Sequence, residues 1–288
     1  MKIALIYDKH SEATTGAYIE KVIRQARLEY SHFGISQAVQ AKEKFDLYLR
    51  IDHGDYKYDL PEQLRPAVFY AIDTHLPKPY KKISRQAKHY DVIFCAQKQG
   101  AIRLKREIKA DAHWLPLACD PQIHCKLDIP KIYDVGFVGR DAKKFARGRQ
   151  LVLLRQKYPD SFIGEADFRE MNEIYGASRV GFNSSIINDI NMRLFEVMSS
   201  GAFLLTNHIR DNGLEDIFED GKHLVTYKND RDLLEKLQYF LAHQAEREKI
   251  AAAGHEAVLN SHTYFHRVQT MFNYLAFKFG GEFNKLRI

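Results

Sequence analysis

Apolar residues recur along the chain in two alternating patterns. Short apolar runs, typical of buried parallel strands, are separated by stretches of about 10–15 residues with apolar positions three and four apart, typical of amphipathic helices. The strands expected in the first half are Ile3–Tyr7, Asp46–Asp52, Pro66–Ile72, Tyr90–Ala96 and His113–Leu117. Those expected in the second half are Tyr133–Val138, Ser161–Gly164, Arg179–Asn183, Ala202–Leu205 and Leu224–Tyr227. This alternation predicts βαβ units and an α/β fold with parallel sheets.

Amphipathic stretches fill the intervals between many of these strands. Helical spacing predicts helices at Tyr18–Phe33, Leu151–Tyr158, Phe168–Tyr175, Gly213–Phe218, Asp230–His243, Ala245–Ala253, His255–Ser261 and Tyr264–Phe279. Gly254 separates two of these helices and is expected to interrupt them, because glycine is a poor helix former. In the last helix, one apolar face is expected from Phe265, Val268, Phe272, Leu275 and Phe279.

The stretch from Ala118 to Pro130 interrupts the alternation. It contains two prolines and shows neither period, so it predicts a linker between domains. A chain of 288 residues is long enough for two domains of ordinary size. We therefore expect an N-terminal domain over residues 1–120 and a C-terminal domain over residues 131–263.

The excess of basic residues indicates an anionic ligand. The formal net charge is +6 and the isoelectric point about 9.0, which suits an anionic partner such as a nucleoside diphosphate, an anionic polymer or a phospholipid surface. No RNA-binding signature, helix-turn-helix pattern or cysteine–histidine finger is found, so nucleic acid is the less favoured main partner.

Location is predicted from what the sequence lacks. No apolar run approaches the ~18 residues of a membrane span, and the run at Ile3–Tyr7 is too short for a secretory signal. The three cysteines, Cys95, Cys119 and Cys125, lack metal-ligand spacing. We therefore expect a cytoplasmic protein with reduced thiols.

One stretch carries most of the candidate chemistry. Residues 191–206 combine a polar loop, a short helix that ends at Ser199-Ser200-Gly201, and a buried strand. A helix that opens from a loop presents free N–H groups and the positive end of its dipole, which suits a phosphate group. The simpler alternative is an amphipathic helix with Arg193 and Glu196 on its surface.

The residues of this stretch also carry a family resemblance. The run Asn191-x-Arg193-x-Phe195-Glu196-x₄-Gly201-x₃-Leu205-Thr206 resembles the signature of the CgeB-like (spore-maturation) glycosyltransferases, which have the GT-B fold. In the wider GT-B group with two glutamates eight residues apart, Glu196 matches the second, which implies hydrogen bonds to the ribose hydroxyls of a nucleotide. Asn188 stands where the first glutamate would be, so the donor-sugar contact and the retaining or inverting outcome stay open.

The resemblance implies an architecture. It implies two Rossmann-like domains that face each other across a cleft, with residues 264–288 packing back on the N-terminal domain. The C-terminal domain would bind a nucleotide-diphosphate sugar as co-substrate, and the N-terminal domain would bind the acceptor. The resemblance implies neither a cofactor nor a bound metal, and we predict no metal ligands.

A strand, a glycine and several basic residues follow the proposed linker. Tyr133–Val138 is followed by Gly139 and by the basic residues Arg140, Lys143, Lys144 and Arg147. Such an arrangement suits a phosphate and resembles the first loop of a GT-B donor domain, although a basic run alone is more often a solvated helix face. The predicted donor-binding residues are Gly139, Arg140, Lys143, Asn183, Asn191, Arg193, Glu196 and Gly201.

The N-terminal half offers acid–base candidates at a strand end. Asp73 and His75 follow Pro66–Ile72, at the sheet edge where α/β proteins bind ligands. They would act as the base if the reaction inverts the anomeric centre; the alternative is an aspartate that caps the next helix and a solvated histidine. Thr15 and Gly16, in the loop after the first strand, are predicted to lie on the acceptor side.

These features favour a glycosyltransferase that moves a sugar from a nucleotide-diphosphate sugar to an acceptor hydroxyl. Arg140 and Arg193 would stabilise the departing diphosphate. The acceptor is open between polysaccharide, protein, lipid and nucleic acid, and peripheral membrane association is an alternative. Two other functions are kept: an inactive module that binds a nucleotide sugar or a polyanion, favoured by Asn188, and a sugar-nucleotide epimerase.

Overall fold

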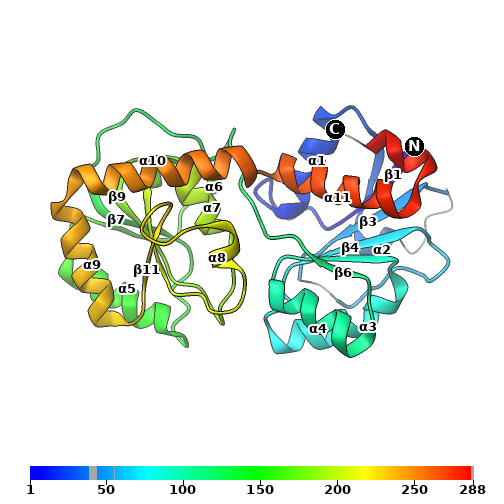
Figure 1. Cartoon of the computed structure of the whole chain (residues 1–288), viewed down its shortest axis with the longest axis horizontal. Coiled ribbons are helices and arrows are strands. Elements are labelled where there is room, and N and C mark those ends of the chain that lie inside the picture. Colours follow the sequence, from blue (N-terminus) through cyan, green and yellow to red (C-terminus); the bar gives the residue numbers. More distant parts are fainter. Residues whose placement is uncertain (39–43, 55, 287–288) are drawn as a thin grey trace. The chain divides into compact units, whose positions relative to one another are not determined.

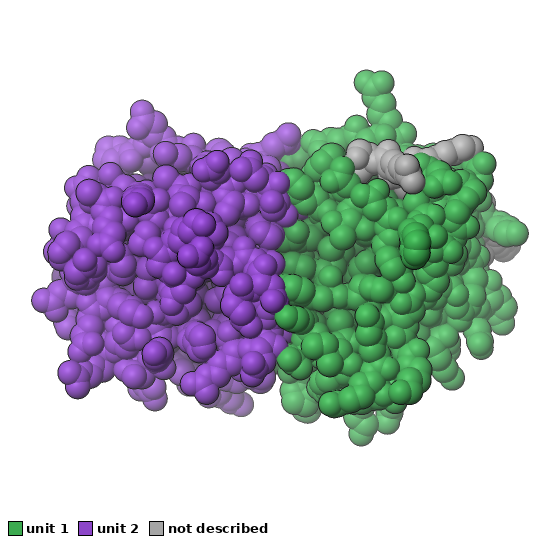
Figure 2. Space-filling model, in the orientation of Figure 1, with its two compact units in different colours: residues 1–117, 264–288 green, residues 118–263 purple. Residues whose placement is uncertain are grey.

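The computed structural model describes residues 1–38, 44–54 and 56–286, and the chain forms two compact units (Figure 2). Unit 1 comprises Met1–Leu117 together with Tyr264–Ile288, and unit 2 comprises Ala118–Thr263. Each unit has one sheet in which every strand pair is parallel. The predicted α/β class with two Rossmann-like units is confirmed.

The sheet of unit 1 has the strand order β2-β1-β3-β4-β5-β6. Its strands are β1 (Lys2–Ile6), β2 (Glu29–Phe33), β3 (Leu47–Ile51), β4 (Ala67–Ala71), β5 (Val92–Cys95) and β6 (Ala112–Trp114). Its helices are α1 (Thr15–Gln25), α2 (Ile35–Ala38), α3 (Pro77–Gln86), η1 (Ala87–His89), α4 (Lys98–Ile108), α11 (Tyr264–Phe279) and η2 (Gly281–Leu286).

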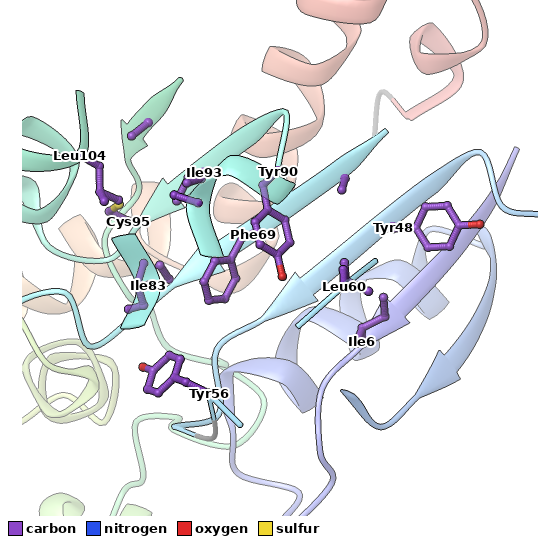
Figure 3. Close-up of a cluster of buried hydrophobic side chains, with 14 of the residues drawn as sticks. Ile6, Tyr48, Tyr56, Leu60, Phe69, Ile83, Tyr90, Ile93, Cys95 and Leu104 are labelled. Carbon is purple, nitrogen blue, oxygen red and sulfur yellow. The ribbon is translucent and has the colours of Figure 1, made fainter. Parts of the chain in front are cut away.

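The helices of unit 1 form two layers. Side chains of α2, α3 and α4 enter one core with alternate residues of the strands, among them Phe69 and Ile93 (Figure 3). Helices α1 and α11 pack against each other on the opposite face of the sheet (Figure 1).

The helix expected at Tyr18–Phe33 begins three residues earlier, at Thr15, and ends eight residues earlier, at Gln25. Helix α1 ends at Gln25, because the chain reverses through Arg27, which adopts φ 55°. Residues Glu29–Phe33 then form β2 at the sheet edge, where no side chain is fully buried. A left-handed turn without glycine and a strand without an apolar face give no sequence signal, which explains the error.

Helix α11 belongs to unit 1 and spans the predicted residues, and its buried face agrees with the prediction at Val268, Phe272 and Leu275. Its buried residues are Tyr264, Arg267, Val268, Met271, Phe272, Leu275 and Ala276. Phe265 is exposed and Phe279 only half-buried, so both were wrongly placed in the apolar face. Arg267 is buried because its Nε donates to the carbonyl of Pro116 over 2.7 Å.

The sheet of unit 2 has the order β11-β10-β9-β7-β8. Its strands are β7 (Tyr133–Val138), β8 (Phe162–Gly164), β9 (Ser178–Asn183), β10 (Phe203–Asn207) and β11 (Val225–Tyr227). Its helices are α5 (Ala146–Lys157), α6 (Phe168–Gly176), α7 (Met192–Ser199), α8 (Leu214–Ile217), α9 (Asp230–Ala242) and α10 (Gln244–Ser261). Helices α5 and α9 contribute to the core on one face, and α7 packs on Gly181 of β9 from the other.

Two expectations about irregular backbone change in unit 2. Gly254 does not interrupt α10; a β-carbon there would lie 2.2 Å from the carbonyl oxygen of His223, so glycine permits a close approach. The irregular stretch at 118–130 lies within unit 2, where Cys119 forms a β-bridge with Thr263. None of the helices in the described part of the chain is long and apolar enough to span a membrane.

Candidate functional site

The two sheets share one winding pattern. In unit 1, β1 lies between β2 and β3; in unit 2, β7 lies between β8 and β9. The chain connections run in opposite directions from the first strand of each sheet, and proteins with such sheets generally bind ligands at the carboxyl ends of the two strands on either side of this switch point. In unit 2 these are the ends of β7 and β9.

Arg193 lies at this point of unit 2. From the first turn of α7, its Nε donates to the carbonyl of Val138, which ends β7, over 3.0 Å. Its Nη1 donates to Oδ1 of Asn183, which ends β9, over 3.1 Å. The guanidinium also covers the Phe137 ring, with Cζ 4.5 Å from the ring centroid. Arg193 is therefore held by both strands at the switch point.

Arg147 lies beside it from the first turn of α5. Its Cζ is 5.8 Å from the centroid of the same Phe137 ring, and its Nε is buried without a hydrogen-bond partner among the described residues. Burial lowers the pKa of Arg147 and the charge of Arg193 lowers it further, while the carboxylates of Asp189 and Asp141 oppose this. Neither arginine forms an ion pair with a carboxylate in the described chain. The two guanidinium groups lie near the same Phe137 ring at the carboxyl ends of β7 and β9. An anion bound there would stabilise this pair of positive charges.

The other predicted phosphate ligands lie differently. The Arg140 side chain is 88% exposed, and its one ion pair among the described residues is with Glu165, at 4.0 Å. Lys143 is exposed too. The structure thus brings Arg147, rather than Arg140 or Lys143, to Arg193. No signal in the sequence indicated this, because the helix was expected to begin at Leu151, whereas α5 begins at Ala146 and so includes Arg147 in its first turn.

The two predicted asparagines have different environments. Asn183 is fully buried, and its Nδ2 donates to Oγ1 of Thr206 while its Oδ1 accepts from Arg193. Asn183 therefore positions the arginine. Asn191 precedes α7 but its side chain does not cap the helix, and its Oδ1 is buried without a hydrogen-bond partner in the described residues. The first turn of α7 is thus left uncapped by that side chain at the edge where Arg193 lies.

Glu196 lies one turn further along α7. It is 6% exposed, and its Oε1 is 3.8 Å from Nε2 of the buried His124. His124 belongs to the irregular stretch predicted as a linker, so sequence spacing gave no indication of this contact. A nearly buried carboxylate beside the switch point fits a residue that accepts ligand hydroxyl hydrogen bonds.

Gly201 and Asn188 complete the predicted run. Gly201 follows the C-terminal end of α7, at φ 73°, and a β-carbon there would lie 2.8 Å from the Lys126 side chain. It lies at the opposite end of α7 from Arg193, where it has a structural role. Ile187 and Asn188 both adopt positive φ, at 55° and 57°, which is uncommon for a β-branched residue.

In unit 1, the loop after β4 is organised by Asp52. Its Oδ2 accepts from the hydroxyl of Tyr56 at 2.8 Å and from the main-chain N–H groups of Ile72 at 2.9 Å and Asp73 at 3.3 Å. This fixes the start of the Asp73–His75 loop, and both side chains are half-buried at the carboxyl edge of the sheet. The N-cap residue of the next helix, α3, is Leu76 rather than Asp73.

A further acid–base pair lies at the switch point of unit 1. Nε2 of His53, after β3, is 3.0 Å from Oδ2 of Asp8, after β1. The sequence did not indicate this pair, because 45 positions separate residues that only the strand order brings together.

Thr15 and Gly16 open α1 and both have packing contacts. Oγ1 of Thr15 is 3.3 Å from the hydroxyl of Tyr264. A β-carbon on Gly16 would lie 2.2 Å from the Tyr7 ring, so glycine is required there. A role on the acceptor side stays a prediction for both residues.

The described residues contain no group of three or more side chains arranged to hold a metal ion. An Asp-x-Asp pair does occur at the start of α9, but both carboxylates are engaged. Asp230 accepts from Nε of Arg149 at 2.8 Å, and Asp232 accepts from the main-chain N–H of Lys228 at 2.8 Å. Arg149, Lys228 and Asp230 line a hollow of about 460 Å³ between the starts of α5 and α9.

The whole chain resembles solved glycosyltransferase structures. HepE from Anabaena, in complex with UDP and glucose, has a TM-score of 0.71 at 10% identity, covering 96% of this chain and 99% of that one. Sucrose-phosphate synthase from Thermosynechococcus elongatus has a TM-score of 0.69 at 12% identity, covering 96% and 99%. An α-glucosyltransferase in complex with UDP and DNA has a TM-score of 0.70 at 10% identity, again covering 96% and 99%.

The fold defines the class of protein: the chain has the fold of the GT-B glycosyltransferases. Within that class, residues 136–273 match the family described as glycosyl transferase-like, and this range includes Arg147, Arg193 and Glu196. No curated protein sequence matches the chain. The predicted enzyme class is confirmed, while the narrower CgeB-like resemblance stays a prediction.

Proposed function

We propose that the protein transfers a sugar from a nucleoside diphosphate sugar to an acceptor hydroxyl, with the donor bound by unit 2. The observation that carries this proposal is the pair of Arg147 and Arg193 over Phe137 at the switch point, without a carboxylate counter-ion among the described residues. Two adjacent cations at a strand edge are stabilised by a ligand with more than one negative charge.

The rest of the donor follows from the position of these arginines. The diphosphate lies against the guanidiniums and the first turn of α7, where the helix dipole also favours an anion. Glu196, one turn away on the same helix, accepts hydrogen bonds from the ribose hydroxyls. The UDP in the HepE and α-glucosyltransferase structures supports a nucleotide at this kind of site, although those proteins share only 10% of their residues with this chain.

The chemical step breaks the bond between the anomeric carbon and the diphosphate and forms one to the acceptor oxygen. Negative charge develops on the departing diphosphate, and fixed guanidiniums stabilise that charge without a bound metal. The acceptor hydroxyl loses its proton to Asp73 or His75 of unit 1 if configuration inverts, and to the departing diphosphate if configuration is retained.

Release of nucleoside diphosphate tests this proposal. Purified protein is incubated with each of a panel of nucleoside diphosphate sugars, with and without polysaccharide, protein, lipid or nucleic acid acceptors. We expect one donor to release its diphosphate only when an acceptor is present. Isomerisation of the donor without release would indicate an epimerase instead. Tight donor binding without either reaction would indicate an inactive binding module.

A further inference from the structure

Helices α3 and α4 carry most of the excess charge of the chain. Residues 77–109 contain ten of the 43 lysines and arginines but only two of the 37 acidic residues. This segment therefore has a formal charge of +8, larger than the +6 of the whole chain, and the remainder is slightly acidic. The charge belongs to one region of unit 1 and not to the protein at large.

The two helices present this charge on neighbouring surfaces. They lie side by side (Figure 1), and the hydroxyl of Tyr80 on α3 donates to Oε2 of Glu107 on α4 over 2.7 Å. Their apolar residues, such as Ile83 and Leu104, are buried in the core. The exposed cations are Lys78, Lys81, Lys82, Arg85, Lys88, Lys105, Arg106 and Lys109, and we call these residues the basic face.

Most cations of the basic face have no acidic partner among the described residues. None of the five between Lys78 and Lys88 forms an ion pair in the described chain, and on α4 Glu107 is shared by Arg103 and Arg106. Helix α9 differs, because its cations pair with carboxylates one turn away. Like charges three and four residues apart destabilise a helix, so this arrangement of cations lowers folding stability.

We propose that the basic face binds a polyanion, a polymer with regularly repeated phosphate or carboxylate groups. Lysine is a point charge that attracts such groups without demanding one geometry, and a series of lysines binds a charged polymer by releasing its counter-ions. Helix α3 begins at Pro77, two residues after His75, so the polymer passes the loop that carries Asp73 and His75. The polymer is therefore the acceptor, an assignment that rests on the proposed function.

The exposed side chains favour a polymer over a membrane surface. A helix that binds a bilayer inserts an apolar face, whereas the apolar faces of α3 and α4 are occupied by the sheet. Among the described residues of these two helices, Ile102 and Ile108 are the large apolar side chains that are exposed.

Direct binding under a series of salt concentrations tests the inference. The probes are long-chain inorganic polyphosphate, polygalacturonate and vesicles that contain phosphatidylglycerol. The test variant is K81Q/K82Q/R85Q/K88Q. The control variant, K157Q/R169Q/K222Q/K249Q, removes four exposed cations of unit 2 and so lowers the net charge equally.

We expect the wild type to bind polyphosphate or polygalacturonate, and the preferred polymer identifies the anionic group. The test variant is expected to bind about tenfold or more weakly, with a log–log salt dependence shallower by about 0.7 for each anionic group that it no longer neutralises. The control variant is expected to stay within about twofold, because distant surface charges are screened.

Three results would overturn the inference: no polymer binding by the wild type, equal losses of affinity in the two variants, or binding to vesicles in preference to both polymers. Donor binding is measured in the same samples. Donor binding without polymer binding contradicts only this inference and leaves the proposed function intact. If the polymer binds but no nucleoside diphosphate sugar does, the basic face is supported as a polyanion-binding site. Its assignment as the acceptor site of a glycosyltransferase is then contradicted.

Discussion

The guanidinium of Arg193 fills the space that a side chain on Gly139 would need. A β-carbon on Gly139 would lie 2.4 Å from Nη2 of Arg193, and the glycine adopts φ 144°, which other residues rarely do. The arginine can lie across the strand ends because the loop after β7 begins with a residue that has no side chain.

Gly139→Ala is therefore expected to displace Arg193 and to weaken nucleoside diphosphate binding about tenfold, or about 1.4 kcal/mol. Titration calorimetry with the best-binding diphosphate measures this. Gly221→Ala is the matched control, because Gly221 also has positive φ, at 80°, but no atom within 4 Å of its would-be β-carbon. Equal affinity in Gly139→Ala and the wild type would show that the position of Arg193 does not matter for the ligand.

The arginine pair makes a prediction about phosphate number. The affinity of the wild type is expected to rise from nucleoside to nucleoside monophosphate to nucleoside diphosphate. Arg193→Lys and Arg147→Ala are each expected to reduce the gain in binding free energy from nucleoside to diphosphate by about 1.5–3 kcal/mol. Lysine does not replace Arg193, because a single ammonium cannot bond both strand ends and the ligand. Arg140→Ala, at an exposed position, is the comparison and is expected to change little. If the Arg193 and Arg147 variants keep the full increase of affinity with phosphate number, these arginines do not contact the phosphate groups.

The sequence predicted most of the parallel strands because each is a short apolar run between polar loops. It missed β2 because residues Glu29–Phe33 form a half-exposed edge strand without alternation, and because Arg27 rather than glycine ends the helix before it. It also divided α10 at Gly254, since a glycine selected for close packing looks the same in sequence as one that ends a helix.

The site was predicted in part for similar reasons. The run from Asn191 to Glu196 is contiguous, so one short pattern showed Arg193 and Glu196 together. Arg147, His124 and the pair of His53 and Asp8 reach their places only through the order of the strands and the path of residues 118–130. No local pattern records that order, and a basic run by itself does not tell which of its members turns back to the sheet.

Asp73 and His75 give a prediction about turnover. If the product has inverted configuration, removal of the base by His75→Ala or Asp73→Asn is expected to lower turnover about 10²–10⁴-fold while donor affinity is kept. The anomeric configuration of the product and the turnover of each variant are measured together. His53→Gln is tested alongside, because His53 with Asp8 is the other acid–base pair at this edge. Normal turnover in both the Asp73 and His75 variants would remove their acid–base role.

Asp111 links the last helix to the stability of unit 1 and gives a prediction about pH. Burial alone would raise the pKa of Asp111, but hydrogen bonds from Lys278, His113 and Tyr274 lower it below its ordinary 3.8. A carboxyl with a lowered folded pKa stabilises the fold above its unfolded pKa, and this contribution is lost as pH falls through the folded value.

Asp111→Asn is thus expected to lower the free energy of unfolding at neutral pH by about 1–2 kcal/mol, the modest value of a partly exposed network. The difference from the wild type should vanish at acid pH below the folded pKa. Denaturant unfolding at a series of pH values measures it, with Asp128→Asn as an exposed control. A difference independent of pH would mean that the charge of Asp111 is not the cause.

The central claim, that unit 2 binds a nucleoside diphosphate sugar along α7, is tested most directly by calorimetric titration of Glu196→Ala. The donor is the nucleoside diphosphate sugar that raises the melting temperature of the wild type most, since tight binding to the folded state stabilises it. We predict that the wild type binds this donor and that Glu196→Ala binds it about 1.5–3 kcal/mol more weakly, as for a hydrogen bond to a charged group. Glu256→Ala, an exposed carboxylate change on α10, should bind it as the wild type does. The account is contradicted if no nucleoside diphosphate sugar binds the wild type, or if a folded Glu196→Ala binds with undiminished affinity.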